Sequence, residues 1–316
     1  MEVKINPPYS ITIIMSTYNG SAYIEKQLDS LLNQKDVSIN LFVRDDGSRD
    51  NTVEIINSYK DQFNKVVIVK EENIGATASF HRAAKLAFDE GEKTEFYAFC
   101  DQDDIWLEEK LITGINRICN MNANKPNLYF SNLMMIDNEY NLLGMLIDDK
   151  LVTCSRENAL AAIYTYGCTC VFNRIALEKF CTISEESNFI YHDNWMYSVC
   201  SFLGTVYYDE QSFINYRQTG KNVSGEKKMG LELWKHRVKK IFDLQNDNHL
   251  YESIADQLLK QHYDELDPND ILLLSHITRY REHWRDKIVL LTSKRMRTRS
   301  FSKNICIMGR ILLNVL

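Results

Sequence analysis

Apolar residues along the first 120 positions follow two alternating patterns. Short β-branched or aromatic runs, such as ITIIMS at 11–16, are typical of buried strands. Between these runs, apolar residues recur at helical spacing, as do Ile24, Leu28 and Leu31. Four repeats of this alternation predict an α/β fold, in which a mostly parallel sheet carries helices on both faces. The predicted strands are 11–16, 39–46, 65–70 and 95–100, and the predicted helices are 21–34, 51–60, 76–91 and about 107–120.

The pattern changes after about residue 125. Strand-like runs continue to residue 218, and the pattern is helical from about residue 228 to the end. The polar segment RQTGKNVSGEKK lies between these parts, so the sequence predicts an α/β domain at 1–225 and a helical C-terminal extension at 226–316. The later strand-like runs are 127–147, 166–174, 205–210 and 212–218, and a helix is predicted at 194–204.

The charge of the chain is unevenly distributed. The 316 residues have a net charge of -6, which disfavours nucleic acid as a partner. No acidic residue follows Asp286, whereas seven basic residues do. A basic, partly apolar tail of this kind is typical of three arrangements. It either binds an anionic membrane surface, or packs as a helix with a solvated basic face, or contacts a second copy in a homodimer.

Cysteine usage and the N-terminus bear on the cell compartment. The eight cysteines form no CxxC pair, and several lie in apolar runs, which favours reduced core residues. The N-terminal sequence MEVKINPPYS lacks a signal pattern, and no run of about 18 apolar residues occurs. We therefore expect a cytoplasmic protein, either free or peripheral on the inner face of the cell membrane.

Polar clusters follow each of the four predicted strands. Parallel strands present their carboxyl ends at one edge of a sheet, where ligands of open α/β folds bind. These clusters are therefore expected to meet at one site. They are Ser16–Gly20 after the first strand, Asp45–Ser48 after the second, Asn73–Gly75 after the third, and Asp101, Asp103 and Asp104 after the fourth.

The chemistry of these clusters indicates a nucleotide ligand. Adjacent carboxylates repel unless water screens them or a cation lies among them, and oxygen ligands suit Mg²⁺ or Mn²⁺. Such a cation normally leaves positions open for substrate phosphates. Asp45 and Asp46 could accept hydrogen bonds from a base or ribose, and Tyr18 offers a ring for stacking. A solvated acidic turn that caps the next helix is the simpler alternative for the aspartates.

Seven segments in order resemble the family-2 glycosyltransferases of the GT-A fold, a Rossmann-like architecture. The form DQDDIW, followed by HDNW and YRQ, is most similar to the bacterial rhamnosyltransferase-like branch, whose members build cell-surface polysaccharides. The resemblance spans residues 11–225. The segments are STYNG, RDDGSRDNT, NIGA, FCDQDDIW, GCTCVFNR, YHDNW and NYRQTGKNVSG.

The resemblance implies a role for each matching residue. Asp193 would be the general base, and Asp101 and Asp103 would form the metal-binding DxD pair, with Asp103 as the direct ligand. Arg217 and Gln218 would lie near the diphosphate. The residues implied to hold the nucleotide or donor are Thr17, Tyr18, Asn19, Asp45, Asp46, Asn73, Gly75, Asp101 and Gln102. Weaker candidates for the sugar or acceptor pocket are Trp106, Gly167, His192 and Trp195, although core packing is the alternative for both tryptophans.

One departure affects the expected metal site. Relatives often have histidine after YRQ, where this chain has Thr219. A threonine is a weaker ligand, so a third protein contact would have to come from His81, His192 or Asn222. The sequence does not decide among these three residues.

The resemblance implies an inverting, metal-dependent transfer of a sugar to a hydroxyl of a glycan or a lipid-linked acceptor. The favoured donor is dTDP-rhamnose, and a UDP-hexose is the alternative. A non-catalytic nucleotide-binding module is the rival from another class. A sugar nucleotidyltransferase is disfavoured because the first loop is STYNG instead of a glycine- and arginine-rich loop, and a receiver domain is disfavoured by chain length.

Overall fold

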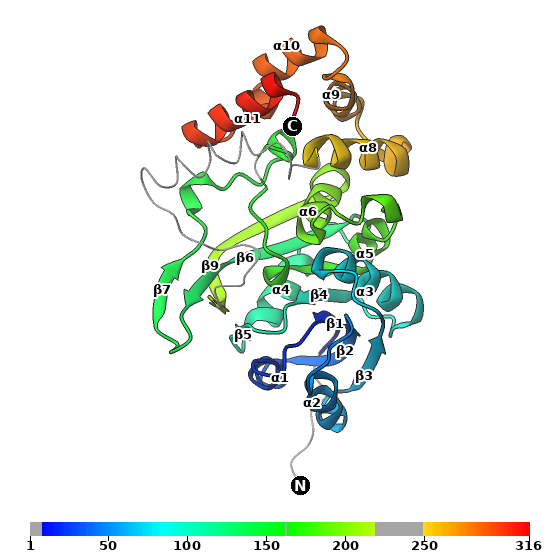
Figure 1. Ribbon diagram of the computed structural model, residues 1–316, viewed down its shortest axis with the longest axis vertical. Helices are drawn as coiled ribbons and strands as arrows, with labels where there is room; N and C mark the ends of the chain where they lie inside the picture. The colour runs from blue at the N-terminus through cyan, green and yellow to red at the C-terminus, as the bar shows by residue number, and fades with distance from the viewer. Residues whose placement is uncertain (1–7, 162, 219–248) are drawn as a thin grey trace.

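The computed structural model describes residues 8–161, 163–218 and 249–316 (Figure 1). Within these ranges the strands form one mixed sheet, in the order β3-β2-β1-β4-β8-β6-β9-β5, with β7 paired to β6. The strands are β1 (Tyr9–Thr17), β2 (Val37–Asp45), β3 (Lys65–Lys70), β4 (Phe96–Cys100), β5 (Ile105–Trp106), β6 (Asn127–Ile136), β7 (Leu142–Met145), β8 (Val171–Asn173) and β9 (Thr205–Arg217).

The first half of the sheet confirms the predicted alternation. Strands β3, β2, β1 and β4 are parallel to one another. Each predicted strand and helix of this half lies within three residues of the observed bounds. The helices are α1 (Ile24–Leu32), α2 (Thr52–Ser58), α3 (Ala76–Glu90) and α4 (Lys110–Cys119).

Two of the later predictions were wrong in detail. The segment 166–174 is a 3-10 turn at Gly167–Thr169 followed by the short strand β8, which runs antiparallel to both neighbours. The segment 205–218 is a single long strand, β9, which pairs in parallel with β6 through two register shifts. A polar DEQ sequence inside β9 marks this irregular stretch, and the sequence pattern alone predicts a break between two strands there.

Each face of the sheet has its own hydrophobic core, as the alternation of side chains along a strand requires. Phe42 and Phe99 contribute to the core beneath α3, α5 (Arg174–Phe180) and α6 (His192–Leu203). Leu41 and Ala98, the residues immediately before them, contribute to the core beneath α1, α2 and α4. Helices therefore cover both faces, as predicted.

The C-terminal helices form a cap at the end of the molecule opposite α1 and α2 (Figure 1). They share the first core, since Ile254, Leu274 and Ile311 cluster with the buried side chains of the sheet. The predicted boundary near residue 225 and the predicted helix that begins near 230 lie outside the described residues. No helix in the described ranges has the length and apolar character that a membrane crossing needs. The helices of the cap are α8 (Leu250–His262), α9 (Pro268–Arg279), α10 (Trp284–Thr292) and α11 (Phe301–Leu313).

Candidate active site

A cavity of about 1210 Å³ opens at the carboxyl edge of the parallel strands. The segment 163–168, the start of α6 and one residue of α11 complete its walls. Convergence of the polar clusters at one edge, which the strand order predicts, is thus confirmed. The predicted site residues that line the cavity are Thr17, Tyr18, Asn19, Asp46, Asn73, Gly75, Asp101, Gln102, Asp103, Gly167, His192 and Asp193.

Gln102 fixes the loop that presents Tyr18 to the cavity. The Gln102 side chain accepts a hydrogen bond from the Tyr18 backbone N–H at 2.9 Å and donates one to its carbonyl oxygen at 3.1 Å. The Tyr18 side chain stays 45% exposed, so its ring is available for stacking. The side chain of Gln102 therefore ties the loop after β1 to the loop after β4.

Asp45 does not line the cavity, contrary to the expectation that it holds the nucleoside. Its buried carboxylate accepts hydrogen bonds from the Thr17 hydroxyl at 3.0 Å and from the Ser48 N–H at 2.8 Å and hydroxyl at 2.5 Å. These bonds occupy the carboxylate inside the protein. Asp45 therefore shapes the loops after β1 and β2, and the adjacent Asp46 is the residue that reaches the cavity.

Asp46 connects β2 to the loop that precedes α3. Its carboxylate accepts hydrogen bonds from the N–H groups of Ile74 and Gly75 at 2.9 and 3.0 Å. Gly75 adopts a φ of +84°, a conformation that side chains with a Cβ rarely take. The Arg44 guanidinium, which is 1% exposed, pairs with Asp46 at 2.5 Å and with Glu71 at 2.9 Å. Arg44 thus compensates a charge that would otherwise be buried alone.

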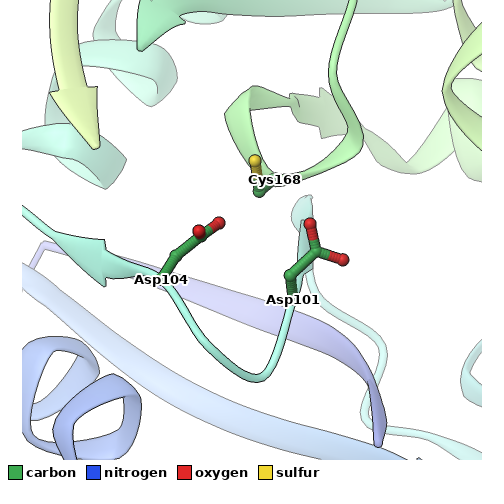
Figure 2. Close-up of side chains that lie close together, drawn as sticks. All are labelled: Asp101, Asp104 and Cys168. Atoms are coloured by element: carbon green, nitrogen blue, oxygen red, sulfur yellow. The ribbon is translucent and has the colours of Figure 1, made fainter. Parts of the chain in front are cut away.

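The aspartates after β4 form a buried anionic cluster. Oxygens of Asp101 and Asp104 and the Cys168 sulfur all lie within 4.8 Å of one another. Figure 2 shows the two carboxylates pointing towards Cys168 from the loop between β4 and β5. Burial, then the charges of Asp103 and Asp193, raise the pKa of Asp101 to about 7. Burial also raises the pKa values of Asp103 and Asp104.

The cluster fits a divalent cation. Among the described residues, neither buried oxygen of Asp104 has a hydrogen-bond partner. Buried carboxylates without donors are costly when ionised, and a cation is the compensation that such oxygens accept. Asp101 and Asp103 also face the cavity, so they could share the cation with a substrate phosphate. Carboxylate oxygens suit Mg²⁺ or Mn²⁺.

Asp193 lies across the cavity, in the first turn of α6. Burial raises the pKa of Asp193 to about 6, although backbone N–H groups act in the opposite direction. One of these is the Asn194 N–H, which donates to Asp193 Oδ1 at 2.8 Å. A half-buried carboxylate with a pKa near neutrality has the properties of a general base.

Comparisons with known proteins agree with this geometry. The family model described as Glycosyl transferase family 2 matches residues 12–180, more than half of the chain. The chain belongs to this family. It is 31% identical over 222 residues to the dTDP-rhamnosyl transferase RfbG of Shigella flexneri. The aligned region covers 67% of this chain and 73% of the relative.

A second relative and a solved structure also resemble this glycosyltransferase. This chain is 29% identical over 215 residues to the UDP-Glc:alpha-D-GlcNAc-diphosphoundecaprenol beta-1,3-glucosyltransferase WfgD of Escherichia coli. The aligned region covers 66% of this chain and 80% of that protein. The crystal structure of S. aureus TarS 1-349 in complex with UDP superposes with a TM-score of 0.54 at 15% identity, covering 96% of this chain and 90% of that one. At this identity the likeness shows the fold, which is GT-A.

His192 and Gly167 face each other at the wall of the cavity. The His192 ring stacks on Phe80, with ring centroids 4.0 Å apart. A Cβ on Gly167 would clash with His192 Nε2, so only glycine leaves room for the ring. Burial lowers the pKa of His192 to about 3, so its imidazole is neutral at physiological pH.

The remaining candidates lie behind the cavity wall. Trp106 and Trp195 are buried in the two cores, and neither is among the residues that line the cavity. Arg217 is also buried, and its Nε donates to the Asp103 carbonyl oxygen at 3.1 Å. The Gln218 N–H extends the sheet by donating to the Ile136 carbonyl oxygen. The two tryptophans therefore pack the core, Arg217 supports the loop of Asp103, and Gln218 does not reach the cavity.

The question raised by Thr219 receives a partial answer. Thr219 and Asn222 lie outside the described residues. His81 is buried, stacks on Phe180 and bonds the Ile190 carbonyl oxygen at 2.7 Å through Nε2. It does not line the cavity, so it is a structural residue.

Sequence reasoning missed several residues of the site. The patterns gave no indication that Arg44 compensates Asp46, or that Lys303 of the C-terminal extension reaches the cavity. Asp104 was part of the recognised acidic run, and its position directly before the apolar residues Ile105 and Trp106 could have indicated that it is enclosed. Cys168 could have been recognised from the GCTCV segment that follows the acidic run in the family pattern.

Replacing Arg44 with methionine is expected to destabilise the protein strongly. The change keeps an unbranched apolar stem but removes the guanidinium, so Asp46 stays buried without its ionic partner. Breaking a buried ion pair in this way costs about 3–5 kcal/mol. Urea unfolding followed by circular dichroism would measure the loss.

The matched control is Lys65→Met, because Lys65 pairs with Glu92 at 2.6 Å on the surface. Exposed pairs contribute about 1 kcal/mol or less. Equal losses in the free energy of unfolding for the two variants would contradict the role assigned to Arg44.

Proposed function

We propose that this glycosyltransferase transfers a sugar from a nucleoside diphosphate to a hydroxyl of a lipid-linked glycan during synthesis of a bacterial surface polysaccharide. One observation carries the proposal: Tyr18, Asp46, Asp101, Asp103 and Asp193 line a single cavity. A stacking ring, hydrogen-bond acceptors, a cation site and a general base are the groups that such a transfer needs. The names of the relatives support sugar transfer of this kind.

Asp193 would remove the proton of the acceptor hydroxyl as the new bond forms at the anomeric carbon. A sugar hydroxyl is a poor nucleophile until its proton leaves, and a carboxylate within hydrogen-bond reach provides about 10²–10⁴-fold acceleration. Attack from the face opposite the leaving group would invert the anomeric centre. A single base is sufficient for this route, and no covalent intermediate is required.

Asp101 and Asp103 would hold the divalent cation, with the orphaned carboxylate of Asp104 beside them. The cation would neutralise the negative charge that develops on the departing nucleoside diphosphate. Arg217 lies behind Asp103 and supports its loop through the hydrogen bond to the carbonyl oxygen. Tyr18 would stack on the base, and Asp46 would accept a hydrogen bond from the nucleoside.

The favoured donor is dTDP-rhamnose, because RfbG of Shigella flexneri carries that activity in its name. A UDP-hexose is the alternative, which the name of WfgD supports. The name of WfgD also includes a diphosphoundecaprenol-linked acceptor, which supports a lipid-linked acceptor here.

A lipid-linked acceptor would place this protein at the inner face of the membrane. Trp284, Phe301 and Leu312 of α10 and α11 are more than half exposed, and Arg285 and Arg299 are exposed near them in the sequence. Apolar side chains mixed with basic ones are typical of surfaces that bind anionic bilayers. Other charges of the basic tail are used within the protein: Arg295, for example, pairs with Asp270 at 2.5 Å.

Replacing Asp193 with asparagine is expected to abolish transfer and to preserve donor binding. The amide cannot accept the proton, so kcat should fall by about 10²–10⁴-fold. The Kd of the donor should stay within about threefold, because Asp193 is assigned to the acceptor. Steady-state kinetics and calorimetric titration would measure both, with Asp61→Asn as a control on the exposed surface. A non-catalytic module would show no transfer by the unaltered protein.

The rate is expected to depend on pH through Asp193. The base works only when ionised, and its pKa is raised to about 6. Transfer at saturating cation should therefore fall about tenfold per pH unit below pH 6 and level off above it. A rate that stays constant down to pH 4.5 would rule out a base with this pKa.

A thermal-shift panel of nucleotide sugars, with and without Mg²⁺ or Mn²⁺, would identify the donor. The correct donor should raise Tm only when the cation is present, because binding to the native state stabilises it. Asp103→Asn should remove the effect of the cation. Equal stabilisation by a donor in the presence of a chelator would contradict the assigned role of the cation.

A further inference from the structure

Lys303 brings a positive charge from the C-terminal extension to the catalytic cavity. It lies in the first turn of α11 and lines the same cavity as Asp101, Asp103 and Asp193. Among the described residues that line this cavity, it is the single lysine or arginine. The family model ends at residue 180, so this residue belongs to a part of the chain that the family pattern does not include.

The position of Lys303 is fixed by local contacts. Its backbone N–H donates to the Ser300 hydroxyl at 3.3 Å, which caps the helix. Its Nζ lies 4.0 Å from the centroid of the Tyr164 ring and 3.5 Å from the Ile163 carbonyl oxygen. A flexible side chain is thus directed towards the segment 163–166 at the cavity wall.

That segment is adjacent to the general base. The Thr165 hydroxyl donates to the Asp193 carbonyl oxygen at 3.3 Å. Tyr166 also lies close to Asp193, because burial and then the Asp193 charge raise the pKa of the Tyr166 hydroxyl. The nucleoside side of the cavity is built by other segments, the loops that follow β1, β2 and β3. Lys303 therefore lies on the side where the acceptor hydroxyl must approach Asp193.

We propose that Lys303 binds a phosphate oxygen of the acceptor, in keeping with an acceptor sugar that is linked to its lipid through a diphosphate. This inference rests on the proposed function and specifies the class of acceptor. The Asp193 carboxylate, which acts as the base only when it is ionised, would repel an anionic acceptor. A half-buried ammonium on the acceptor side would offset that repulsion with a charge-assisted hydrogen bond.

Binding of decyl diphosphate tests the inference directly. The donor site is first filled with Mg²⁺ and the nucleoside diphosphate, dTDP or UDP, that gives the larger thermal shift, so that the probe does not occupy it. Lys303→Gln should raise the Kd of decyl diphosphate about tenfold or more, as the loss of a charged hydrogen bond predicts. Lys303→Arg should stay within about threefold, because it retains the charge. Lys294→Gln, the same change at an exposed position of the tail, should match the unaltered protein.

Two further measurements distinguish the other sources of phosphate. If Lys303 held the donor instead, Lys303→Gln would weaken binding of the nucleotide sugar and leave decyl diphosphate unaffected. If it held the bilayer, Lys303→Gln would reduce binding to phosphatidylglycerol vesicles more than Lys294→Gln does, again without affecting decyl diphosphate. Either result, or an unchanged Kd for decyl diphosphate, would overturn the inference.

Failure of the proposed function would look different. If no nucleotide or nucleotide sugar stabilises the unaltered protein, the donor assignment fails by itself. Decyl diphosphate would then be titrated in the absence of nucleotide. Loss of that binding in Lys303→Gln, with binding by Lys294→Gln preserved, would still support a phosphate site at Lys303.

Discussion

Repulsion among buried carboxylates is the constraint on which the site depends. Asp101, Asp103 and Asp104 follow a buried strand, and burial raises the pKa of each. A fold selected only for stability would expose such carboxylates to water or pair each of them with a basic side chain. Here Arg217 lowers the pKa of Asp103, but the oxygens of Asp104 have no hydrogen-bond partner among the described residues. A divalent ion among the carboxylates would offset this repulsion, and cation binding would then be coupled to the integrity of the site.

The contrast with the other acidic pair shows that this repulsion is a local feature. Asp45 and Asp46 are also adjacent and buried, yet the charge of each carboxylate is compensated by partners inside the protein. Asp45 accepts bonds from Thr17 and Ser48, and Asp46 pairs with Arg44. The same residue type at the ends of β2 and β4, which flank β1, thus has two arrangements. Asp45 and Asp46 fix the loops after β2, and the other cluster has oxygens that a cation could bind.

The sequence was sufficient to predict the parallel half of the sheet, because each strand there is a continuous apolar run and each connection is an amphipathic helix. It also predicted the edge where the polar clusters meet, since that follows from strand direction alone. It could not predict that Asp45 turns inward while Asp46 faces the cavity, because that choice depends on the partners Ser48 and Arg44. The predicted strand at 166–174 is shortened to β8 by the 3-10 turn at Gly167–Thr169. The sequence pattern could not show this, because Gly167 leaves room for the ring of His192, a residue distant in sequence.

The position of Lys303 suggests how acceptor specificity can vary while the chemistry of the family is retained. The strands and loops that hold the donor, the cation site and the strand β8 lie within or near the part that the family model matches. Asp193, the proposed base, and the Lys303 ammonium come after it, on α6 and α11. The C-terminal helices share a core with the sheet, so a change in their packing would move Lys303 relative to Asp193. A terminal extension that is packed this firmly can therefore determine which acceptor reaches the base, while the donor side remains unchanged.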